Sequence, residues 1–204
     1  MAAAIDVYFD FRSPYAYFLS QRLRSETVVR RGHSWRWRPV SIDVLLNLQA
    51  GREPWAPYVD PLSGPKRTHL IADVRRLATF YDVKLRAPKP ARPNSIPALY
   101  LASRLDEQER AAFIPAVFNA LWQEQQDIST PELLAACLGR AGARSDGLRA
   151  AFEEGARAGL AQETSAAYAR GVFGVPTFIF DNEVVFGNDR LDLLLWMIER
   201  RLTG

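Results

Sequence analysis

Segments with the pattern of β-strands lie only near the two ends of this chain. Near the N-terminus, Ile5–Phe9 is a short apolar run, and Trp35–Val40 alternates aromatic and basic residues as a half-buried strand does. Near the C-terminus, Thr177–Phe180 and Glu183–Phe186 are joined by Asp181-Asn182, a two-residue turn of the kind that closes β-hairpins. The segment between these regions has mainly helical spacing. We therefore predict the order β-α-β, a helical insertion, and then β-β-α.

This order is that of an α/β protein with a thioredoxin-like fold and a large all-helical insertion between the second and third strands. We predict that residues 1–41 and 171–204 form the thioredoxin-like domain and that residues 42–170 form the inserted helical domain. Within the insertion, apolar residues at helical spacing predict a helix over 70–81, after a proline-rich loop from Gly51 to Lys66.

The composition excludes several classes of function. The chain has 26 basic and 23 acidic residues without a long basic run, so we expect no nucleic-acid partner, whereas a small anionic ligand fits a slightly basic rim. Cys137 is the only cysteine, and His33 and His69 lack the spacing of metal ligands, so we expect neither a disulfide framework nor a metal site. We expect no signal peptide, since no basic and apolar leader pattern precedes Asp6, and no apolar run is long enough to span a membrane. We therefore expect a cytoplasmic protein that does not bind membranes.

The junction between the first strand and the first helix is the first candidate site. Ser13 followed by Pro14 is typical of a helix N-cap with proline at the first helical position. Such a junction presents free backbone N–H groups and a partial positive charge, so Ser13 either caps the helix or also binds an anion. In a thioredoxin fold this junction lies beside a cis-proline at the start of the next strand. Val175-Pro176 occupies that position, but the sequence does not determine which isomer it adopts.

Four segments in this order carry a resemblance to a known family: Asp10-Phe11-Arg12-Ser13-Pro14-Tyr15, Asn94-Ser95, Gly171-Val172-Phe173-Gly174-Val175-Pro176-Thr177-Phe178 and Phe186-Gly187-Asn188-Asp189-Arg190-Leu191. As a set they resemble the 2-hydroxychromene-2-carboxylate isomerases, which belong to the DsbA-like superfamily and are related to the kappa-class glutathione transferases. The resemblance runs nearly from end to end. It implies a thioredoxin-like fold and an enzyme that uses glutathione.

The resemblance implies that Ser13 stands where thiol oxidoreductases of the superfamily have the first cysteine of a Cys-x-x-Cys pair. Because Ser13-Pro14-Tyr15-Ala16 contains no cysteine, the thiol would have to arrive with glutathione. The Ser13 hydroxyl and the helix dipole would then stabilise its thiolate. The Val175 backbone would pair with the cysteinyl part of glutathione, and the same site would include Pro176, Phe186 and Gly187.

The resemblance also implies that Asn188 and Asp189 hold the γ-glutamyl group of glutathione. Helix N–H groups would bind its carboxylate, and Asp189 would bind its ammonium group. The alternative is that Asn188 and Asp189 only cap the last helix.

For an isomerase, the thiolate would add to the conjugated, ring-opened form of an aromatic carboxylate, allow rotation about a single bond, and then leave. The resemblance places Tyr15, Lys66 and Asn94 near this substrate, although Lys66 is equally compatible with a solvated surface lysine. One departure concerns Gly51-Arg52-Glu53-Pro54, where the isomerases usually have an asparagine, and a longer loop from Trp55 to Gly64 follows. The aromatic residues of this loop leave room for a different substrate.

Three functions stay open at this point. The first is a glutathione-dependent cis-trans isomerase that converts 2-hydroxychromene-2-carboxylate to trans-o-hydroxybenzylidenepyruvate in aromatic catabolism. The second is a kappa-type glutathione transferase or peroxidase, which would consume glutathione. The third is a non-catalytic DsbA-like binding protein. The resemblance also makes a homodimer possible, but no residue pattern demonstrates one.

Overall fold

A four-stranded mixed sheet forms the centre of the molecule in the computed structural model, which describes residues 3–25, 28 and 32–203. The strand order is β2-β1-β3-β4, with β1 and β2 parallel and the other neighbours antiparallel. The strands are β1 (Ala4–Phe9), β2 (Ser34–Pro39), β3 (Thr177–Phe180) and β4 (Glu183–Phe186). All four predicted strands are therefore confirmed.

The hairpin between β3 and β4 has the predicted two-residue turn. Asp181 and Asn182 have φ angles of 52° and 64°, in the left-handed region that a type I′ turn requires at both positions. Phe180 pairs with Glu183 across this turn. The turn thus fixes the register of β3 and β4.

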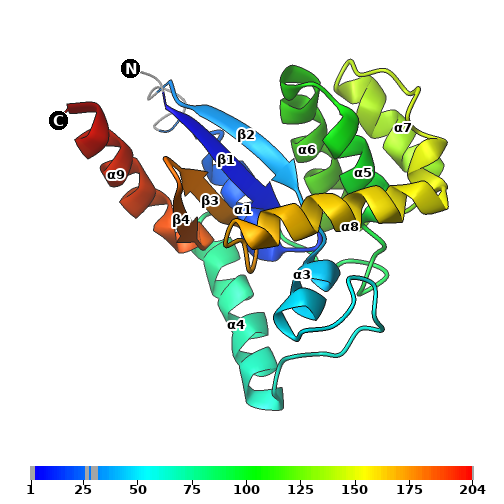
Figure 1. The fold of residues 1–204 in the computed structure, drawn as a ribbon, viewed down its shortest axis with the longest axis horizontal. Coiled ribbons are helices and arrows are strands. Elements are labelled where there is room, and N and C mark those ends of the chain that lie inside the picture. The colour runs from blue at the N-terminus through cyan, green and yellow to red at the C-terminus, as the bar shows by residue number, and fades with distance from the viewer. Residues whose placement is uncertain (1–2, 26–27, 29–31, 204) are drawn as a thin grey trace.

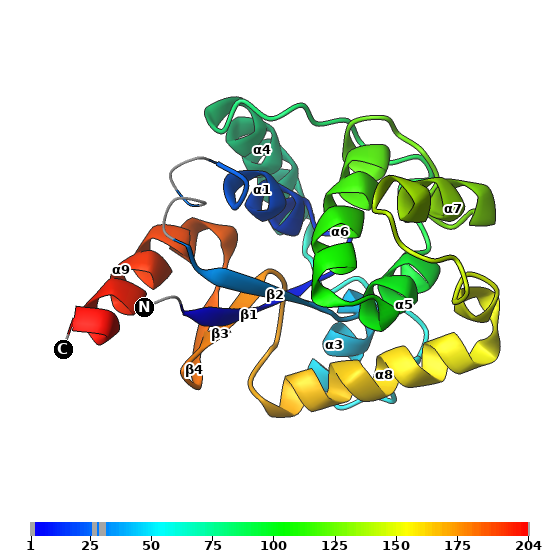
Figure 2. The same ribbon diagram turned by 90° about the horizontal axis from the view of Figure 1, so that it is seen from above.

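Helices cover both faces of the sheet. Figure 2 shows α1 (Pro14–Arg22) and α4 (Gly64–Phe80) on one side of the sheet and α8 (Glu154–Ala169) on the other. Side chains of β1 alternate between the two faces: Ile5, Val7 and Phe9 enter the main core, whereas Tyr8 joins a smaller apolar cluster on the α8 side. The chain ends in η2 (Asn188–Arg190) and α9 (Leu191–Thr203), and Leu191, Leu194 and Ile198 of α9 also enter the main core.

Helices are the only regular secondary structure in the described part of the insertion between β2 and β3. Besides α4 and α8 it contains α3 (Ile42–Gln49), α5 (Ile96–Arg104), α6 (Glu107–Trp122), α7 (Pro131–Arg140) and a short 3₁₀ turn, η1 (Ala150–Phe152). Figure 1 shows α5, α6 and α7 gathered at the end of the molecule opposite to α9. The thioredoxin-like fold with a helical insertion is confirmed.

The predicted loop from Gly51 to Lys66 is too long at its C-terminal end, because α4 begins at Gly64 and contains Lys66. The first turns of α4, up to His69, are exposed. They therefore lack the periodic apolar residues by which a helix is detected in a sequence. Pro65 in the first turn, a position that helices favour for proline, was the remaining signal of this start.

The insertion supports the β1–α1 junction. The Trp122 indole of α6 donates to the Phe11 carbonyl at 2.8 Å, and the Phe118 ring packs on the Phe11 ring with 5.0 Å between centroids. One buried core contains Phe9 and Phe11 together with Phe118.

The division into domains 1–41 with 171–204 and 42–170 stays a prediction. Among the described residues, no helix has the length and apolar character needed to cross a membrane.

Candidate active site

Ser13 joins the two halves of the candidate site. Its backbone is extended (φ −84°, ψ 115°), and its Oγ accepts a hydrogen bond from the Ala16 N–H at 3.2 Å, so it is the N-cap of α1. The same Oγ donates to the Val175 carbonyl at 3.3 Å. Only 4% of Ser13 is exposed. The β1–α1 junction therefore touches the segment before β3.

The peptide bond between Val175 and Pro176 is cis, which answers the question that the sequence left open. No acidic residue lies in the first turn of α1. The positive end of the helix dipole is therefore not neutralised from within that turn. A hydroxyl group, a helix N-terminus and the backbone beside a cis-proline thus converge at one place.

Phe186 and Gly187 lie beside this backbone. The Gly187 N–H donates to the Pro176 carbonyl at 3.0 Å, and Gly187 has a φ of 111°, which favours glycine. The Phe186 ring, which is partly exposed, packs against Phe173 with 4.7 Å between centroids. A Cβ atom at Gly174 would come within 2.8 Å of the Phe186 ring. The absence of a side chain at Gly174 therefore allows the Phe173–Phe186 pair to lie close to the Val175–Pro176 segment.

Tyr15 points from the first turn of α1 to α4, where its hydroxyl donates to Asp73 Oδ2 at 3.0 Å. Burial raises the pKa of Tyr15, and the hydrogen bond to Asp73 and the charges of Asp73 and Asp189 raise it further. The phenol therefore stays protonated over the neutral range, its proton is directed to Asp73, and its oxygen can accept a hydrogen bond. Sequence reasoning missed Asp73, because nothing in its local pattern distinguishes it from a solvated helix residue.

Asn188 and Asp189 have different surroundings. Asn188 is buried: its amide donates to the Tyr81 hydroxyl at 3.2 Å, and its Oδ1 accepts from Arg22 Nη1 at 3.3 Å. The Asn188 carbonyl accepts a further bond from the same Arg22 nitrogen. Asn188 therefore fastens η2 to α1 and does not cap α9, which begins at Leu191. The exposed carboxylate of Asp189, whose charge acts on Tyr15, is the group of this pair that a ligand can reach.

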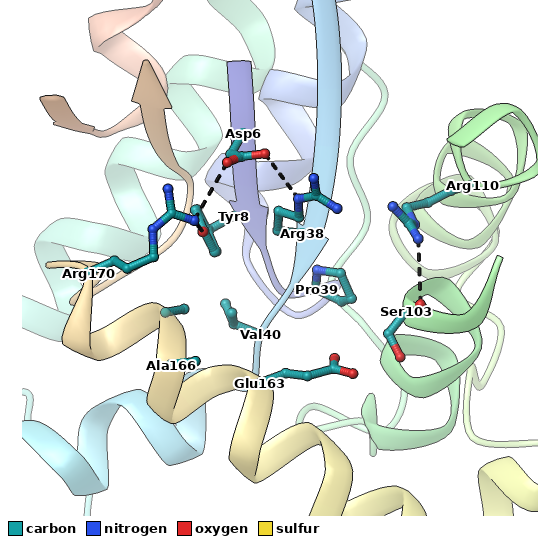
Figure 3. Close-up of a pocket in the computed structure, with 11 residues that line it drawn as sticks. Asp6, Tyr8, Arg38, Pro39, Val40, Ser103, Arg110, Glu163, Ala166 and Arg170 are labelled. Atoms are coloured by element: carbon teal, nitrogen blue, oxygen red, sulfur yellow. Dashed lines mark hydrogen bonds and ion pairs between the residues drawn. The ribbon is translucent and has the colours of Figure 1, made fainter. Parts of the chain in front are cut away.

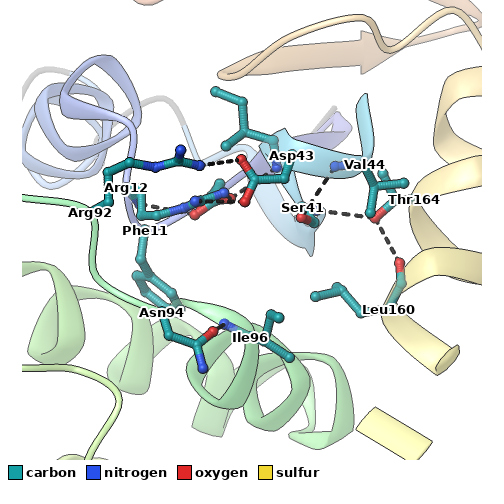
Figure 4. Close-up of polar contacts among 12 residues, drawn as sticks. Phe11, Arg12, Ser41, Asp43, Val44, Arg92, Asn94, Ile96, Leu160 and Thr164 are labelled. Atoms are coloured by element: carbon teal, nitrogen blue, oxygen red, sulfur yellow. Dashed lines mark hydrogen bonds and ion pairs between the residues drawn. The ribbon is translucent and has the colours of Figure 1, made fainter. Parts of the chain in front are cut away.

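A second polar cluster follows the β1–α1 loop to the insertion (Figure 4). Asp10 is fully buried and accepts hydrogen bonds from the backbone N–H groups of Arg12 and Ile42, both at 2.9 Å. Arg12 forms ion pairs with Asp10 at 3.2 Å and with Asp43 at 2.9 Å, and Asp43 also pairs with Arg92 at 3.1 Å. Burial alone would lower the pKa of Arg12, but the Asp10 and Asp43 carboxylates outweigh it and raise the pKa.

Asn94 borders this cluster. Its Oδ1 accepts a hydrogen bond from the Ile96 N–H at 3.1 Å, at the start of α5. A pocket of about 250 Å³ lies between Asn94, Arg92 and Arg12. The Arg12 Nε atom is buried without a hydrogen-bond partner among the described residues. The polar side chains around the pocket therefore include the Asn94 amide, two guanidinium groups and the Asp43 carboxylate that pairs with both of them, and only the amide was identified from the sequence.

Lys66 does not line this pocket. It is exposed in the first turn of α4, seven residues before Asp73. That separation is two turns along the same helix face, or about 10 Å. The loop between α3 and α4 is held by a side chain of α3. The Asn47 amide donates to the Pro54 and Ala56 carbonyls at 2.9 Å each. The Tyr58 ring of this loop lies 3.4 Å below the Arg92 guanidinium, so the loop supports the Arg92 side of the pocket.

Cys137 lies buried on α7, and burial raises the pKa of its thiol. We expect the native protein to react with a disulfide reagent such as dithiobis(nitrobenzoate) on the order of 100-fold more slowly than the urea-unfolded chain, because a thiolate must form and be reached. Following the release of nitrothiobenzoate with and without urea measures this ratio. Equal rates would show that Cys137 is an accessible thiol.

Comparison with known proteins gives consistent results. The chain matches the DSBA-like thioredoxin domain family over residues 4–199. It is 31% identical over 195 residues to a 2-hydroxychromene-2-carboxylate isomerase of Sphingobium xenophagum, covering 95% of this chain and 97% of that protein. It is 32% identical over 209 residues to the protein of the same name from Pseudomonas putida, covering 93% of this chain and 91% of that protein.

Solved structures show the same relationship. The structure of a 2-hydroxychromene-2-carboxylate isomerase superposes with a TM-score of 0.79 at 28% identity and covers 98% of this chain and 96% of that chain. The cytosolic disulfide reductase DsbM from Pseudomonas aeruginosa has the same fold, with a TM-score of 0.64 at 18% identity and 98% of each chain covered.

Proposed function

Because the chain belongs to the DsbA-like thioredoxin family and, within it, to the family of the 2-hydroxychromene-2-carboxylate isomerases, we propose that it is a glutathione-dependent cis-trans isomerase of an aromatic carboxylate. The observation that supports this most strongly is the position of Ser13, whose hydroxyl lies between the N-terminus of α1 and the Val175 carbonyl. A sulfur atom bound there would meet a hydrogen-bond donor and the positive end of a helix dipole.

The residues present fit glutathione. Gly174 and Gly187 flank the Val175–Pro176 backbone, and a Cβ atom at either glycine would meet Phe186 or Asp189. The peptide of glutathione would pair with this backbone. Asp189 supplies an exposed carboxylate for an ammonium group on the same side as Tyr15. Asn188 acts in this proposal by fastening η2 to α1 through Arg22, which holds Asp189 and the start of α9 in place. Phe186 forms an apolar wall.

Ser13 is the catalytic residue of this proposal. When bound, glutathione supplies a thiolate that adds reversibly to the conjugated double bond of the substrate and so lets that bond rotate. Ser13 transfers its hydrogen bond from the Val175 carbonyl to the sulfur atom and keeps the thiol ionised near neutral pH. Tyr15, whose proton is held by Asp73, can accept a hydrogen bond from a hydroxyl group of the substrate. No proton has to be removed from Ser13.

The pocket between Asn94, Arg92 and Arg12 is the place we propose for the substrate carboxylate. Planar guanidinium groups bind carboxylates in two-point geometry, and the Asn94 amide adds a donor. The substrate carboxylate would share the Arg12 and Arg92 guanidinium groups with Asp43. Lys66, two turns from Asp73 at the start of α4, is the alternative cation.

Arg92→Gln is expected to raise KM for the aromatic carboxylate about tenfold with little change in kcat, because it removes one charged hydrogen-bond partner of the ground state and transition state alike. Steady-state kinetics at saturating glutathione measure this. Lys66→Gln is the matched variant. A rise in KM for Lys66→Gln with no change for Arg92→Gln would assign the carboxylate to Lys66 instead.

The experiment that tests the proposed function follows the absorbance of 2-hydroxychromene-2-carboxylate with the protein, with and without glutathione. Conversion to trans-o-hydroxybenzylidenepyruvate that requires glutathione and leaves its concentration unchanged supports the isomerase. Stoichiometric loss of glutathione would identify a kappa-type transferase or peroxidase instead. The absence of any glutathione effect on binding or turnover would indicate a non-catalytic DsbA-like binding protein. A cytoplasmic location and a homodimer stay predictions.

A further inference from the structure

A pocket of about 390 Å³ lies on the α8 side of the sheet, on the face opposite to the main core (Figure 3). The parallel register places Asp6 beside Arg36 and Tyr8 beside Arg38 on this face. Arg170, at the end of α8, reaches the same place from the other side. None of the pocket's lining residues belongs to the Ser13 site or to the Asn94 pocket.

Three guanidinium groups surround a single buried carboxylate in this pocket. Asp6 Oδ1 lies 3.0 Å from Nε of both Arg36 and Arg38, and Asp6 Oδ2 lies 3.6 Å from Arg170 Nη1. Two further acids lie nearby: Glu107 pairs with Arg110 at 3.0 Å and with Arg38 at 3.4 Å, and Glu163, which also lines the pocket, lies 3.7 Å from Arg104. The cluster keeps an excess of positive charge, because among the residues that the structure describes its three guanidinium groups face only the Asp6 carboxylate and the Glu107 carboxylate that Arg38 shares with Arg110.

Several donors of this cluster are available to a ligand. Within the described part of the chain, Arg38 donates through Nε and Nη1 and Arg170 through Nη1, which leaves Nη2 of each for a ligand. The side chains of Arg38 and Arg170 are 37% and 48% exposed. The Tyr8 hydroxyl accepts a hydrogen bond from Arg170 Nη1 at 2.5 Å. The hydroxyl group can therefore donate its own hydrogen bond to a ligand. Burial raises the pKa of Tyr8, which keeps the hydroxyl proton in place at neutral pH. Arg110, by contrast, already donates hydrogen bonds to the backbone carbonyls of Ala102 in α5 and of Leu105, which follows α5.

The floor between these donors is apolar. Pro39, Val40, Ala166 and Ala167 line it, and Figure 3 shows Val40 and Ala166 between Arg170 on one side and Arg38 on the other. Val40 and Ala167 are almost fully buried and Ala166 is exposed, so an inorganic anion would use the guanidinium groups but leave the open part of the floor at Ala166 in contact with water. An anion with a flat apolar body would cover the floor and gain from its burial.

We propose that this pocket is a second ligand site, which binds a small aromatic carboxylate through Arg38, Arg170 and Tyr8. The two guanidinium groups and the phenol hold the carboxylate, and Val40 and the α8 alanines contact the ring. The site is independent of glutathione and of the proposed isomerase activity, since it shares no residue with either.

The test is calorimetric titration of the full chain with salicylate at constant ionic strength and without glutathione. Saturable binding is expected, and Arg170→Gln should weaken it about tenfold because a charged hydrogen-bond partner is lost. Arg149→Gln, which changes an arginine that is 95% exposed away from the pocket, should leave it unchanged. Arg170→Lys, which keeps the charge, should weaken binding less than Arg170→Gln does.

Three results would overturn the proposal. The first is no saturable binding of salicylate. The second is binding that falls in Arg92→Gln but not in Arg170→Gln, which would place salicylate in the Asn94 pocket. The third is inorganic phosphate binding as tightly as salicylate, which would show that the apolar floor contributes nothing to ligand choice. Because the side chain of Arg170 is half exposed, its replacement is not expected to unfold the chain.

Discussion

Replacing Ser13 with alanine is expected to lower kcat/KM for glutathione-dependent isomerisation about 100-fold, the usual cost of removing one preorganised donor to a developing or stabilised anion. The Ser13 hydroxyl is the donor that lies at the N-terminus of α1 beside the cis Val175–Pro176 bond. The loss should appear mainly in kcat at saturating glutathione, because the backbone and Asp189 still bind the peptide. Steady-state kinetics over a range of pH measure it.

Ser13→Ala also removes a helix cap, which by itself costs about 1 kcal/mol of stability. Asp106 provides the matched control. It caps α6 with a full capping box, its side chain accepting from the Glu109 N–H at 2.8 Å, and it is exposed on the insertion. Asp106→Ala should lower stability by a similar amount without changing kcat/KM. Equal kinetic losses in both variants would mean that Ser13 acts only as a cap.

Asp10→Ala is expected to have the largest effect on stability, lowering the free energy of unfolding by about 3 to 5 kcal/mol, because it leaves the largely buried Arg12 guanidinium without one of its two carboxylates. It also leaves the Arg12 and Ile42 N–H groups without their acceptor. For a chain of this size the midpoint of thermal unfolding should fall by about 10 °C. Urea denaturation followed by circular dichroism measures the change.

Asp146→Ala is the control for Asp10→Ala. Asp146 pairs with Arg144 on the surface, where both side chains are mostly exposed, and such pairs contribute about 0 to 1 kcal/mol. Asp10→Asn should fall between the two, since its amide oxygen can still accept a backbone hydrogen bond. A stability loss for Asp10→Ala no greater than that for Asp146→Ala would contradict the structural role assigned to the Asp10–Arg12–Asp43 cluster.

Much of the fold could be predicted because its strands carry their own signals. The apolar run of β1, the alternation in β2 and the Asp181-Asn182 turn each depend on residues that are neighbours in the sequence. The start of α4 could not be predicted from apolar spacing, because its first turns face solvent. Periodicity reports a buried face, and an exposed helix end has none.

The candidate site divides in the same way. Ser13 and the Val175–Pro176 bond were identified from local motifs and from the resemblance to a family. The partners of Tyr15 and Arg92 were not, because Asp73 and Asp43 reach them only through the packing of the insertion against the β1–α1 loop. Asn188 looked like a helix cap because its residue type favours that role. Its burial beside Arg22 is set by tertiary structure.

The measurement that tests the central claim most directly is the ionisation of the glutathione thiol while it is bound. Thiolate absorbance in the ultraviolet, recorded as a difference spectrum against free glutathione over a range of pH, gives the pKa of the bound thiol. If Ser13 stabilises the thiolate, the pKa of the bound thiol lies clearly below that of free glutathione in the native protein and returns toward the free value in Ser13→Ala. A bound thiol that ionises at the same pH as free glutathione, or one whose lowered pKa is unchanged in Ser13→Ala, would contradict the role of Ser13.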